Sequence, residues 1–159
     1  MPFHLSDVVR GVRSSRKYFL RHLDGLTPAQ WSWKPYPACK SVVETLAHLV
    51  TDDSAYLQSL QTGVEPTYEA LEVAERDPGR LLQMLQESHE TLLAYIEEKY
   101  ADAPLDSTVT AWGSPLPLGS AVAHISSEDF YHAGQIAFIR MATDPDWDYY
   151  TAVYGEHSE

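Results

Sequence analysis

Cysteine and long apolar runs are both scarce in this chain. Cys39 is the single cysteine, so the chain holds no internal disulfide, which is typical of a protein in a reducing compartment. No apolar run approaches the roughly 18 residues of a membrane-spanning helix, and the polar N-terminus does not resemble a signal peptide. These absences predict a cytoplasmic protein without a membrane partner.

Basic residues are also few. The chain has 11 Lys and Arg against 23 Asp and Glu, which gives a formal net charge of -12. Because this charge repels phosphate backbones and anionic lipids, we expect no nucleic-acid partner. The basic residues between Arg10 and Arg21 form one cluster, and their spacing mostly fits the solvated face of a helix.

Apolar periodicity predicts four long helices in a single domain that spans residues 1–159. The 159 residues, 44% of them hydrophobic, are enough to bury one core that can hold a site. Ser6 as an N-cap, the capping box of Ser41 with Glu44, and Asp77 followed by Pro78 indicate helix starts. The predicted helices cover residues 6–24, 41–62, 78–100 and 120–143, with ends that are approximate.

The segments between and after these helices are predicted to be ordered connections. Residues 27–40 combine prolines with aromatic residues, which favours a pinned loop, and residues 101–119 are rich in Pro, Gly and Ser, which favours a long crossover. We expect the aromatic tail at 144–159 to dock on the helices. Together these features predict an all-α fold, a four-helix bundle with long crossover connections.

Glu128 and His132 are the most informative polar pair. They lie one helical turn apart and share a sector with Ile125 and Ile136, so both are predicted to face the core. A carboxylate on an apolar face needs a partner or a bound cation, because its desolvation is costly. Three interpretations stay open: a pair of metal ligands, a hydrogen bond between the two side chains, or a glutamate that reaches solvent at the edge of the stripe.

Four further polar residues are candidates for the same site. His48 in the second predicted helix lies away from the apolar stripe, so periodicity predicts an exposed histidine, although its short neighbours also suit a shallow polar cavity. Asp52 lies one turn beyond His48, His124 lies one turn before Glu128, and Gln135 borders the same sector. Each could orient a ligand, or His124 could be an extra one, and each also suits a solvated helix edge.

The other histidines and the cysteine are predicted to have structural roles or none. His89 falls on the apolar stripe of the third helix, where we expect a buried neutral histidine with a backbone hydrogen-bond partner. His4 and His22 lie on polar segments and receive no role. Cys39 has no base near it in sequence, so its thiol is predicted to be inert.

Three motifs resemble the DinB/YfiT superfamily over nearly the whole chain. They are KSVVETLAHL at residues 40–49, LTPAQWSWKP at 26–35 and HAGQ at 132–135. The resemblance implies a four-helix bundle, often dimeric, with a divalent-metal site formed by one histidine of the second helix and an HxxxH pair of the fourth. Its members include proteins regarded as metal-dependent hydrolases, and thiol-dependent transferases and isomerases, some of which use bacillithiol or mycothiol.

Carried over to this chain, the resemblance makes His48 the ligand of the second helix and His132 the second histidine of the pair. Glu128 stands where the first histidine is expected, and Lys40 replaces an aromatic residue that is common before the second helix. Two histidines and a carboxylate are a known catalytic ligand set with open positions. The expected cofactor is therefore a divalent metal, with zinc or nickel favoured and iron or manganese possible.

The expected function is that of a metal-dependent enzyme acting on a small molecule. The metal would activate either a low-molecular-weight thiol of the bacillithiol or mycothiol kind, giving an S-transferase, or a water molecule, giving a hydrolase. A homodimer is expected from the resemblance. The alternative is a non-catalytic dimeric binding or stress-response module with a degenerate metal site, because Glu128 departs from the family pattern.

Overall fold

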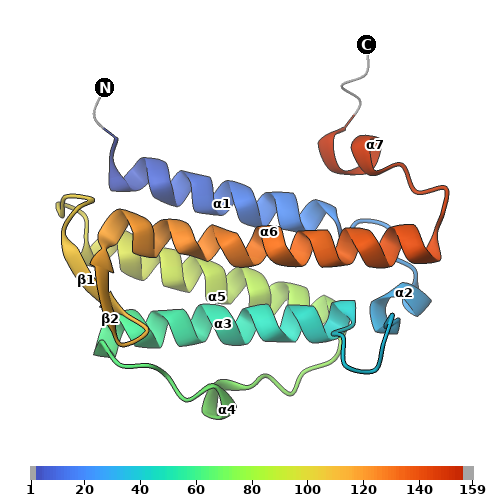
Figure 1. Cartoon of the computed structure of the whole chain (residues 1–159), viewed down its shortest axis with the longest axis horizontal. Coiled ribbons are helices and arrows are strands. Elements are labelled where there is room, and N and C mark those ends of the chain that lie inside the picture. The colour runs from blue at the N-terminus through green and yellow to red at the C-terminus, as the bar shows by residue number, and fades with distance from the viewer. Residues whose placement is uncertain (1–2, 156–159) are drawn as a thin grey trace.

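Four long helices form the bundle in the computed structural model, which describes residues 3–155. They are α1 (Leu5–Arg21), α3 (Val42–Thr62), α5 (Pro78–Lys99) and α6 (Leu118–Thr143). α1 packs along α6, and α3 packs along α5, so the two pairs form two layers (Figure 1). The predicted all-α four-helix bundle is confirmed.

Local hydrogen bonds explain where these helices begin. At α3, Ser41 Oγ accepts from the Glu44 N–H at 3.2 Å, and the Glu44 carboxylate accepts from the Ser41 N–H at 2.7 Å. At α5, the Asp77 carboxylate caps the helix by accepting from the Arg80 N–H at 2.8 Å. The start of α1 differs from the prediction: Ser6 is not the N-cap, because the helix begins one residue earlier, where the Asp7 carboxylate accepts from the N–H of His4 at 2.9 Å.

Five short elements lie in segments that the sequence predicted to be loops. They are α2 (Pro28–Ser32), α4 (Tyr68–Leu71), β1 (Thr108–Ala111), β2 (Ser114–Pro117) and α7 (Tyr149–Tyr154). α2 forms because Thr27 and Gln30 make a capping box inside the proline-rich segment. The crossover at residues 101–119 contains an antiparallel hairpin of β1 and β2, and α6 begins at Leu118. The residues of the tail beyond 155 lie outside the described part.

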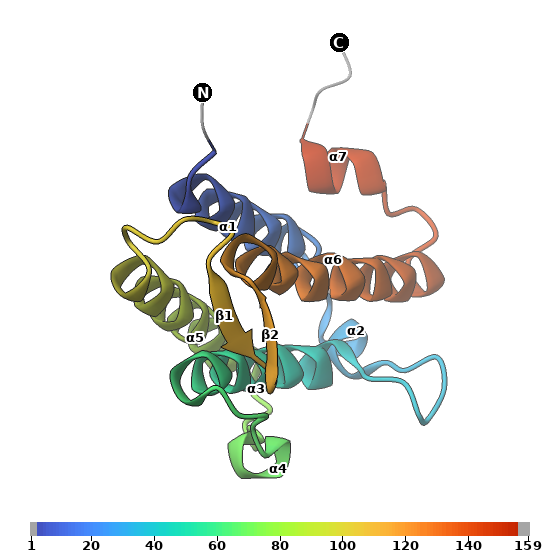
Figure 2. The same ribbon diagram turned by 60° about the vertical axis from the view of Figure 1, so that its left-hand side comes forward.

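The hairpin holds its turn in an unusual backbone conformation. Its two central residues, Trp112 and Gly113, have φ values of 54° and 69°, the pattern of a type I′ turn. A side chain at positive φ costs roughly 1–2 kcal/mol, so tryptophan destabilises this turn relative to glycine. Figure 2 shows the hairpin reaching from the start of α6 down to α3, where the Trp112 N–H donates to Ser59 Oγ.

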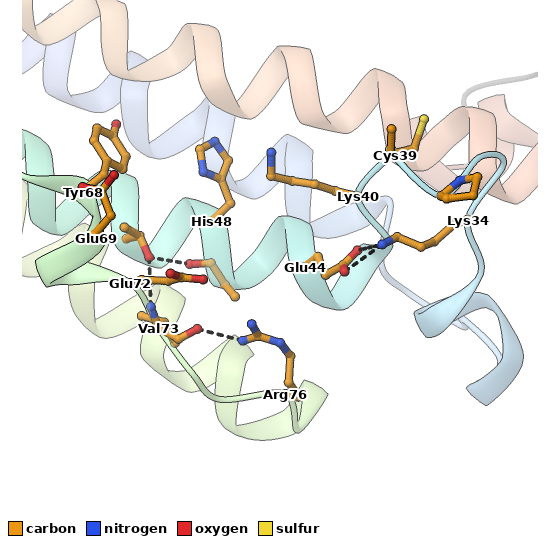
Figure 3. Close-up of a pocket in the computed structure, with 14 residues that line it drawn as sticks. Lys34, Cys39, Lys40, Glu44, His48, Tyr68, Glu69, Glu72, Val73 and Arg76 are labelled. Carbon is orange, nitrogen blue, oxygen red and sulfur yellow. Dashed lines mark hydrogen bonds and ion pairs between the residues drawn. The ribbon is translucent and has the colours of Figure 1, made fainter.

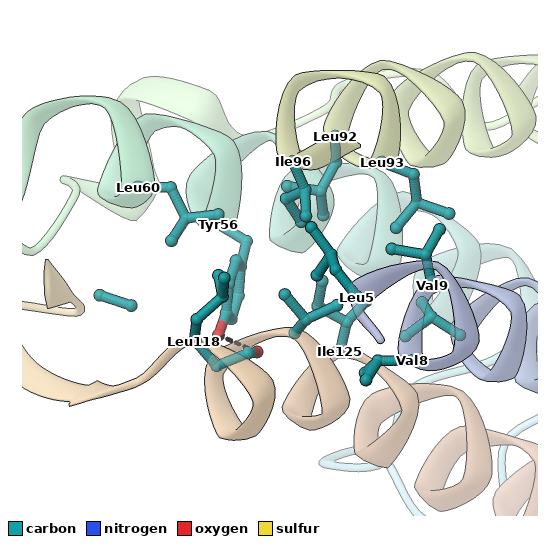
Figure 4. Packing of buried hydrophobic residues seen from close by; sticks show 14 of the residues in the cluster. Leu5, Val8, Val9, Tyr56, Leu60, Leu92, Leu93, Ile96, Leu118 and Ile125 are labelled. Atoms are coloured by element: carbon teal, nitrogen blue, oxygen red, sulfur yellow. Dashed lines mark hydrogen bonds between the residues drawn. The ribbon is translucent and has the colours of Figure 1, made fainter. Parts of the chain in front are cut away.

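The apolar core is divided into two clusters. One surrounds Leu5, Val9, Leu92 and Ile96 near the hairpin end of the bundle, and it also contains Tyr56, whose hydroxyl donates to a carbonyl of α6 (Figure 4). The other contains Phe19, Leu46, Leu81, Leu85 and Ile136 near the opposite end. Burial of these side chains supplies most of the driving force for folding.

A buried polar layer crosses the bundle between the two clusters, and each long helix contributes one residue to it. Its members are Arg16, Asp53, His89 and Asp129, all at most 4% exposed. The Arg16 guanidinium donates to Asp129 at 2.7 Å and to both oxygens of Asp53 at 3.1 Å. Burial raises the pKa of Asp129, whereas at Asp53 the charge of Arg16 outweighs burial and lowers the pKa.

The buried polar residues correct predictions for Arg16, His89 and His22. Arg16 belongs to the basic cluster that was expected to face solvent, yet it is buried. His89 is buried, but within residues 3–155 neither ring nitrogen has a hydrogen-bond partner, and its Nδ1 lies 3.6 Å from Asp53. His22, outside the layer, is also buried, with its Nδ1 bonded to the Tyr18 carbonyl at 2.9 Å.

The aromatic tail contacts α1 through its short helix. The Tyr149 and Tyr18 hydroxyls are hydrogen-bonded at 2.7 Å, and Arg21 donates to the Val153 carbonyl at 3.0 Å. Within residues 3–155, none of the helices combines the length and apolar character needed to cross a bilayer.

The polar layer predicts an asymmetry between two arginines of α1. Replacing Arg16 by methionine leaves two buried carboxylates without their cationic partner, so the free energy of unfolding should fall by about 3–5 kcal/mol. Arg13→Met is the matched control, because Arg13 pairs with Glu90 and Glu97 at a partly exposed position, where the loss should be about 0–1 kcal/mol. Urea denaturation followed by circular dichroism measures both, and equal losses would contradict a structural role for the layer.

Candidate metal centre

His48, Glu128 and His132 converge between α3 and α6. One ligand atom from each residue can be chosen so that all three atoms lie within 4.8 Å of one another. Glu128 and His132 share one face of α6 because they are four residues apart. His48 approaches from α3, which runs antiparallel to α6, and its ring centroid lies 5.1 Å from that of His132. A zinc-like ion lies about 2.0–2.2 Å from each of its donors, so small side-chain movements would bring these three donor atoms onto one cation.

Gln135 fixes the orientation of the His132 ring. The His132 Nδ1–H donates to the Gln135 side-chain oxygen at 2.7 Å, which leaves a lone pair on Nε2. That Nε2 is buried without a hydrogen-bond partner in the described chain and lies 3.5 Å from the Glu128 carboxylate. With the ring proton on Nδ1 alone, two acceptors face each other, and either a proton shared between them or a bound cation makes this contact favourable.

The charge states of the cluster suit a cation. Burial lowers the pKa of His48, and the neighbouring His132 and Lys40 add to this effect, so the neutral imidazole is favoured. The pKa of Glu128 is lowered by its interaction with His132, against the effect of burial, so the carboxylate is ionised. Neutral imidazoles and an ionised carboxylate are the forms that bind metals.

The other three candidate residues occupy different positions. Gln135 contacts His132, as described. Asp52 is half-buried and accepts from the Tyr68 hydroxyl rather than contacting His48, and burial raises its pKa. His124 is exposed and is not part of the metal-capable cluster, although its ring lies 6.5 Å from that of Tyr56. Periodicity predicted His48 to be exposed; it is half-buried because α6 packs over it.

Three cavities meet at the cluster. The outer cavity, of about 850 Å³, is bordered by all three residues of the cluster together with Tyr36, Cys39, Lys40, Tyr131 and Phe138. The α4 cavity, of about 470 Å³, opens on the other side of His48 and is lined by α4 (Figure 3). The hairpin cavity, of about 310 Å³, begins at Glu128 and extends past Trp112. A ligand at the cluster can therefore extend in several directions.

Lys40 and Tyr68 are site residues that sequence reasoning did not assign. The Lys40 side chain extends toward His48 in Figure 3 and makes no ion pair within the described part of the chain. Tyr68 lies on α4, which the sequence did not predict, and reaches Asp52. Lys40 was noticed as a departure from the family pattern, but nothing in the spacing of Tyr68 indicated its position.

The fold and the cluster are those of a bundle with a metal-capable site between two antiparallel helices. A family model of the DinB superfamily matches residues 12–136, a range that includes His48, Glu128 and His132. The chain belongs to the DinB superfamily. A comparison with curated proteins gave no match.

The donor set fits a divalent metal. Two imidazole nitrogens and one carboxylate oxygen are common ligands of zinc and of other first-row metals. Within residues 3–155, the Nε2 of His132 has no hydrogen-bond partner, and the other ring nitrogen is already bonded to Gln135. Nε2 is therefore free to bind a metal. The described residues therefore offer three donor atoms for one divalent ion.

The hydrogen bond from His132 predicts the tautomer of its ring. In metal-free protein at pH 8, long-range ¹H–¹⁵N NMR should show His132 protonated on Nδ1, and Gln135→Leu should shift the proton toward Nε2. His22 provides an internal reference, because its Nδ1 faces a carbonyl oxygen, which can only accept. A His132 ring protonated on Nε2 in the unsubstituted protein would contradict the assignment.

Proposed function

We propose that this DinB superfamily protein binds one divalent metal ion through His48, Glu128 and His132. The observation that carries the proposal is the convergence of three donor atoms within 4.8 Å around a buried imidazole nitrogen that lacks a partner in the described chain. An uncompensated acceptor at such a position is costly, and a bound cation removes that cost.

The carboxylate ligand sets the properties of this site. Glu128 reduces the net charge of the site from +2 to +1, so the ion is a weaker Lewis acid than it would be among three histidines. Zinc or nickel is favoured by the imidazoles, and iron or manganese is compatible with two histidines and one carboxylate.

The bound ion would lower the pKa of a water molecule or a thiol at an open position. The chain supplies the other components: Gln135 holds His132 in place, and Lys40 offers a positive charge in the outer cavity for an anionic group. We therefore infer a metal-dependent enzyme acting on a small molecule, either a transferase that uses a low-molecular-weight thiol or a hydrolase. Its setting is the cytoplasm, in agreement with the single cysteine.

The thiol and hydrolase activities are separated by a direct assay. Metal-loaded protein is tested for conjugation of a low-molecular-weight thiol to 1-chloro-2,4-dinitrobenzene and for hydrolysis of a p-nitrophenyl ester. Turnover that disappears in His48→Ala identifies the reaction. Absence of both activities in metal-loaded protein would favour the alternative, a non-catalytic binding or stress-response module. The presence of Glu128 where the family pattern has a histidine supports this alternative.

We further propose a homodimer. The outer face of α6 exposes four large apolar side chains in a row, namely Phe130, Tyr131, Phe138 and Met141, each more than half exposed. Exposed apolar residues that lie together are typical of an association surface. Sedimentation velocity tests this part, and a monomer at micromolar concentration would contradict it.

Metal content is the first prediction of the proposed function. Protein isolated without an affinity tag should hold one divalent ion per chain by plasma mass spectrometry, and His48→Ala, Glu128→Ala and His132→Ala should each lose it. His124→Ala is the matched control, because His124 lies one turn before Glu128 and should leave the content unchanged. Metal-free protein that folds equally well in every variant would contradict the site.

Two further variants test how the affinity for the metal depends on the residues of the site. Gln135→Leu removes the hydrogen bond that orients His132, so affinity should fall by roughly 10–100-fold while the stoichiometry stays at one. Glu128→His supplies the third imidazole of the family pattern, so it should retain the ion. Competition with a chromogenic chelator measures both, and loss of the ion in Glu128→His would show that Glu128 does not occupy a ligand position.

A further inference from the structure

The hairpin cavity has aromatic walls built from three different elements. Tyr56 comes from α3, Tyr68 from α4 and Trp112 from the hairpin turn. The rings of Trp112 and Tyr68 are stacked at 5.7 Å with an interplanar angle of 14°, and the ring of Tyr56 lies 5.6 Å from Trp112 at 78°. The three rings pack against one another and together line a cavity of about 310 Å³, which is large enough for one small molecule.

Hydrogen bonds hold each wall in place. The Tyr56 hydroxyl donates to the Ala121 carbonyl of α6 at 2.6 Å, and the Tyr68 hydroxyl donates to Asp52. The Trp112 backbone N–H donates to Ser59, which fixes the turn in its left-handed conformation. Because each of the three rings is anchored, the aromatic lining exists before any ligand enters, and binding does not require the rings to be ordered first.

The charge that faces this cavity is negative. Its lining includes the carboxylates of Asp52, Glu65 and Glu128. Arg16 and Asp53 also reach the cavity, but the charge of Arg16 is already matched by its contacts with Asp53 and Asp129. Asp52 is half-buried and makes no ion pair in residues 3–155.

Aromatic rings and the negative charge of the lining together favour an organic cation. The negative face of each ring attracts an ammonium group, and rings also cover the apolar groups that such a cation carries. A hard metal ion is a poorer fit, because Asp52 is not part of the metal-capable cluster and the walls offer rings rather than oxygens. An anion is disfavoured by the acidic lining.

We infer that the hairpin cavity binds the ammonium group of a small organic amine. Glu128 lines both this cavity and the outer cavity, so a ligand seated against Trp112 points its other end toward the metal ligands. The ammonium compound is then the class of substrate on which the protein acts. This last step rests on the proposed function, whereas binding of the cation does not.

Calorimetric titration of metal-free protein with choline and with 3,3-dimethylbutan-1-ol tests the inference. The alcohol is the neutral counterpart of choline with nearly the same shape, so their comparison isolates the positive charge. Choline should bind at least about tenfold more tightly than the alcohol, in line with the strength of desolvated cation–π contacts. Equal affinities, or no binding of choline up to 20 millimolar, would overturn the inference.

Two variants locate the binding. Trp112→Leu and Asp52→Asn should each weaken choline at least about fivefold, the first by removing a ring and the second by removing a charge from a side chain of the same shape. Trp147→Leu is the control, because Trp147 packs against Arg140 away from the cavity and should leave affinity unchanged. Thermal melting checks that each variant is folded, and choline affinity that is unchanged in folded Asp52→Asn and Trp112→Leu would overturn the inference.

The same titrations separate this inference from the proposed function. If choline binds as described but the substitutions of His48, Glu128 and His132 leave the metal content unchanged, the ammonium site stands. The metal centre then fails, and with it the role of the ammonium site in substrate recognition. If the metal binds through His48 and choline does not bind, the ammonium site fails and the metal centre stands.

Discussion

The bundle depends on one buried arginine that binds two aspartates on different helices. Arg16 of α1 reaches Asp53 of α3 and Asp129 of α6, and it thereby fixes the axial position of these two antiparallel helices. The metal-capable residues are close neighbours of these anchors, since Glu128 precedes Asp129 directly and His48 lies just over one turn before Asp53. Loss of one partner from a buried network of this kind is strongly destabilising, because it leaves buried charge uncompensated.

The positions of the four long helices could be predicted because their apolar residues recur every three or four positions and because their capping residues are distinctive. The short elements were missed: a capping box inside a proline-rich loop and a turn with tryptophan at positive φ do not produce a periodic signal. Arg16 was assigned to solvent with the rest of its basic cluster, whose spacing mostly fits a solvated face, although its own position lies on the stripe of Val9, Val12 and Phe19 and indicated burial.

The candidate site could likewise be predicted only in part from the sequence. Glu128 and His132 could be paired from spacing alone, because both lie on one helix. His48 came from the resemblance to the family, since its own wheel position predicted exposure, and the bond between His132 and Gln135 depends on rotamers that no periodicity describes. Trp112 and Tyr68 could not be placed near the site, because their positions follow from how the hairpin and α4 fold back on α3.

The proposed cation lies in the seam between α3 and α6. Anomalous diffraction from a crystal of the zinc-loaded protein, recorded above and below the zinc absorption edge, tests its presence most directly. One strong anomalous peak per chain is expected, bonded to a nitrogen of His48, a carboxylate oxygen of Glu128 and Nε2 of His132. A peak bonded to Cys39 or to surface carboxylates, with none between these three residues, would contradict it.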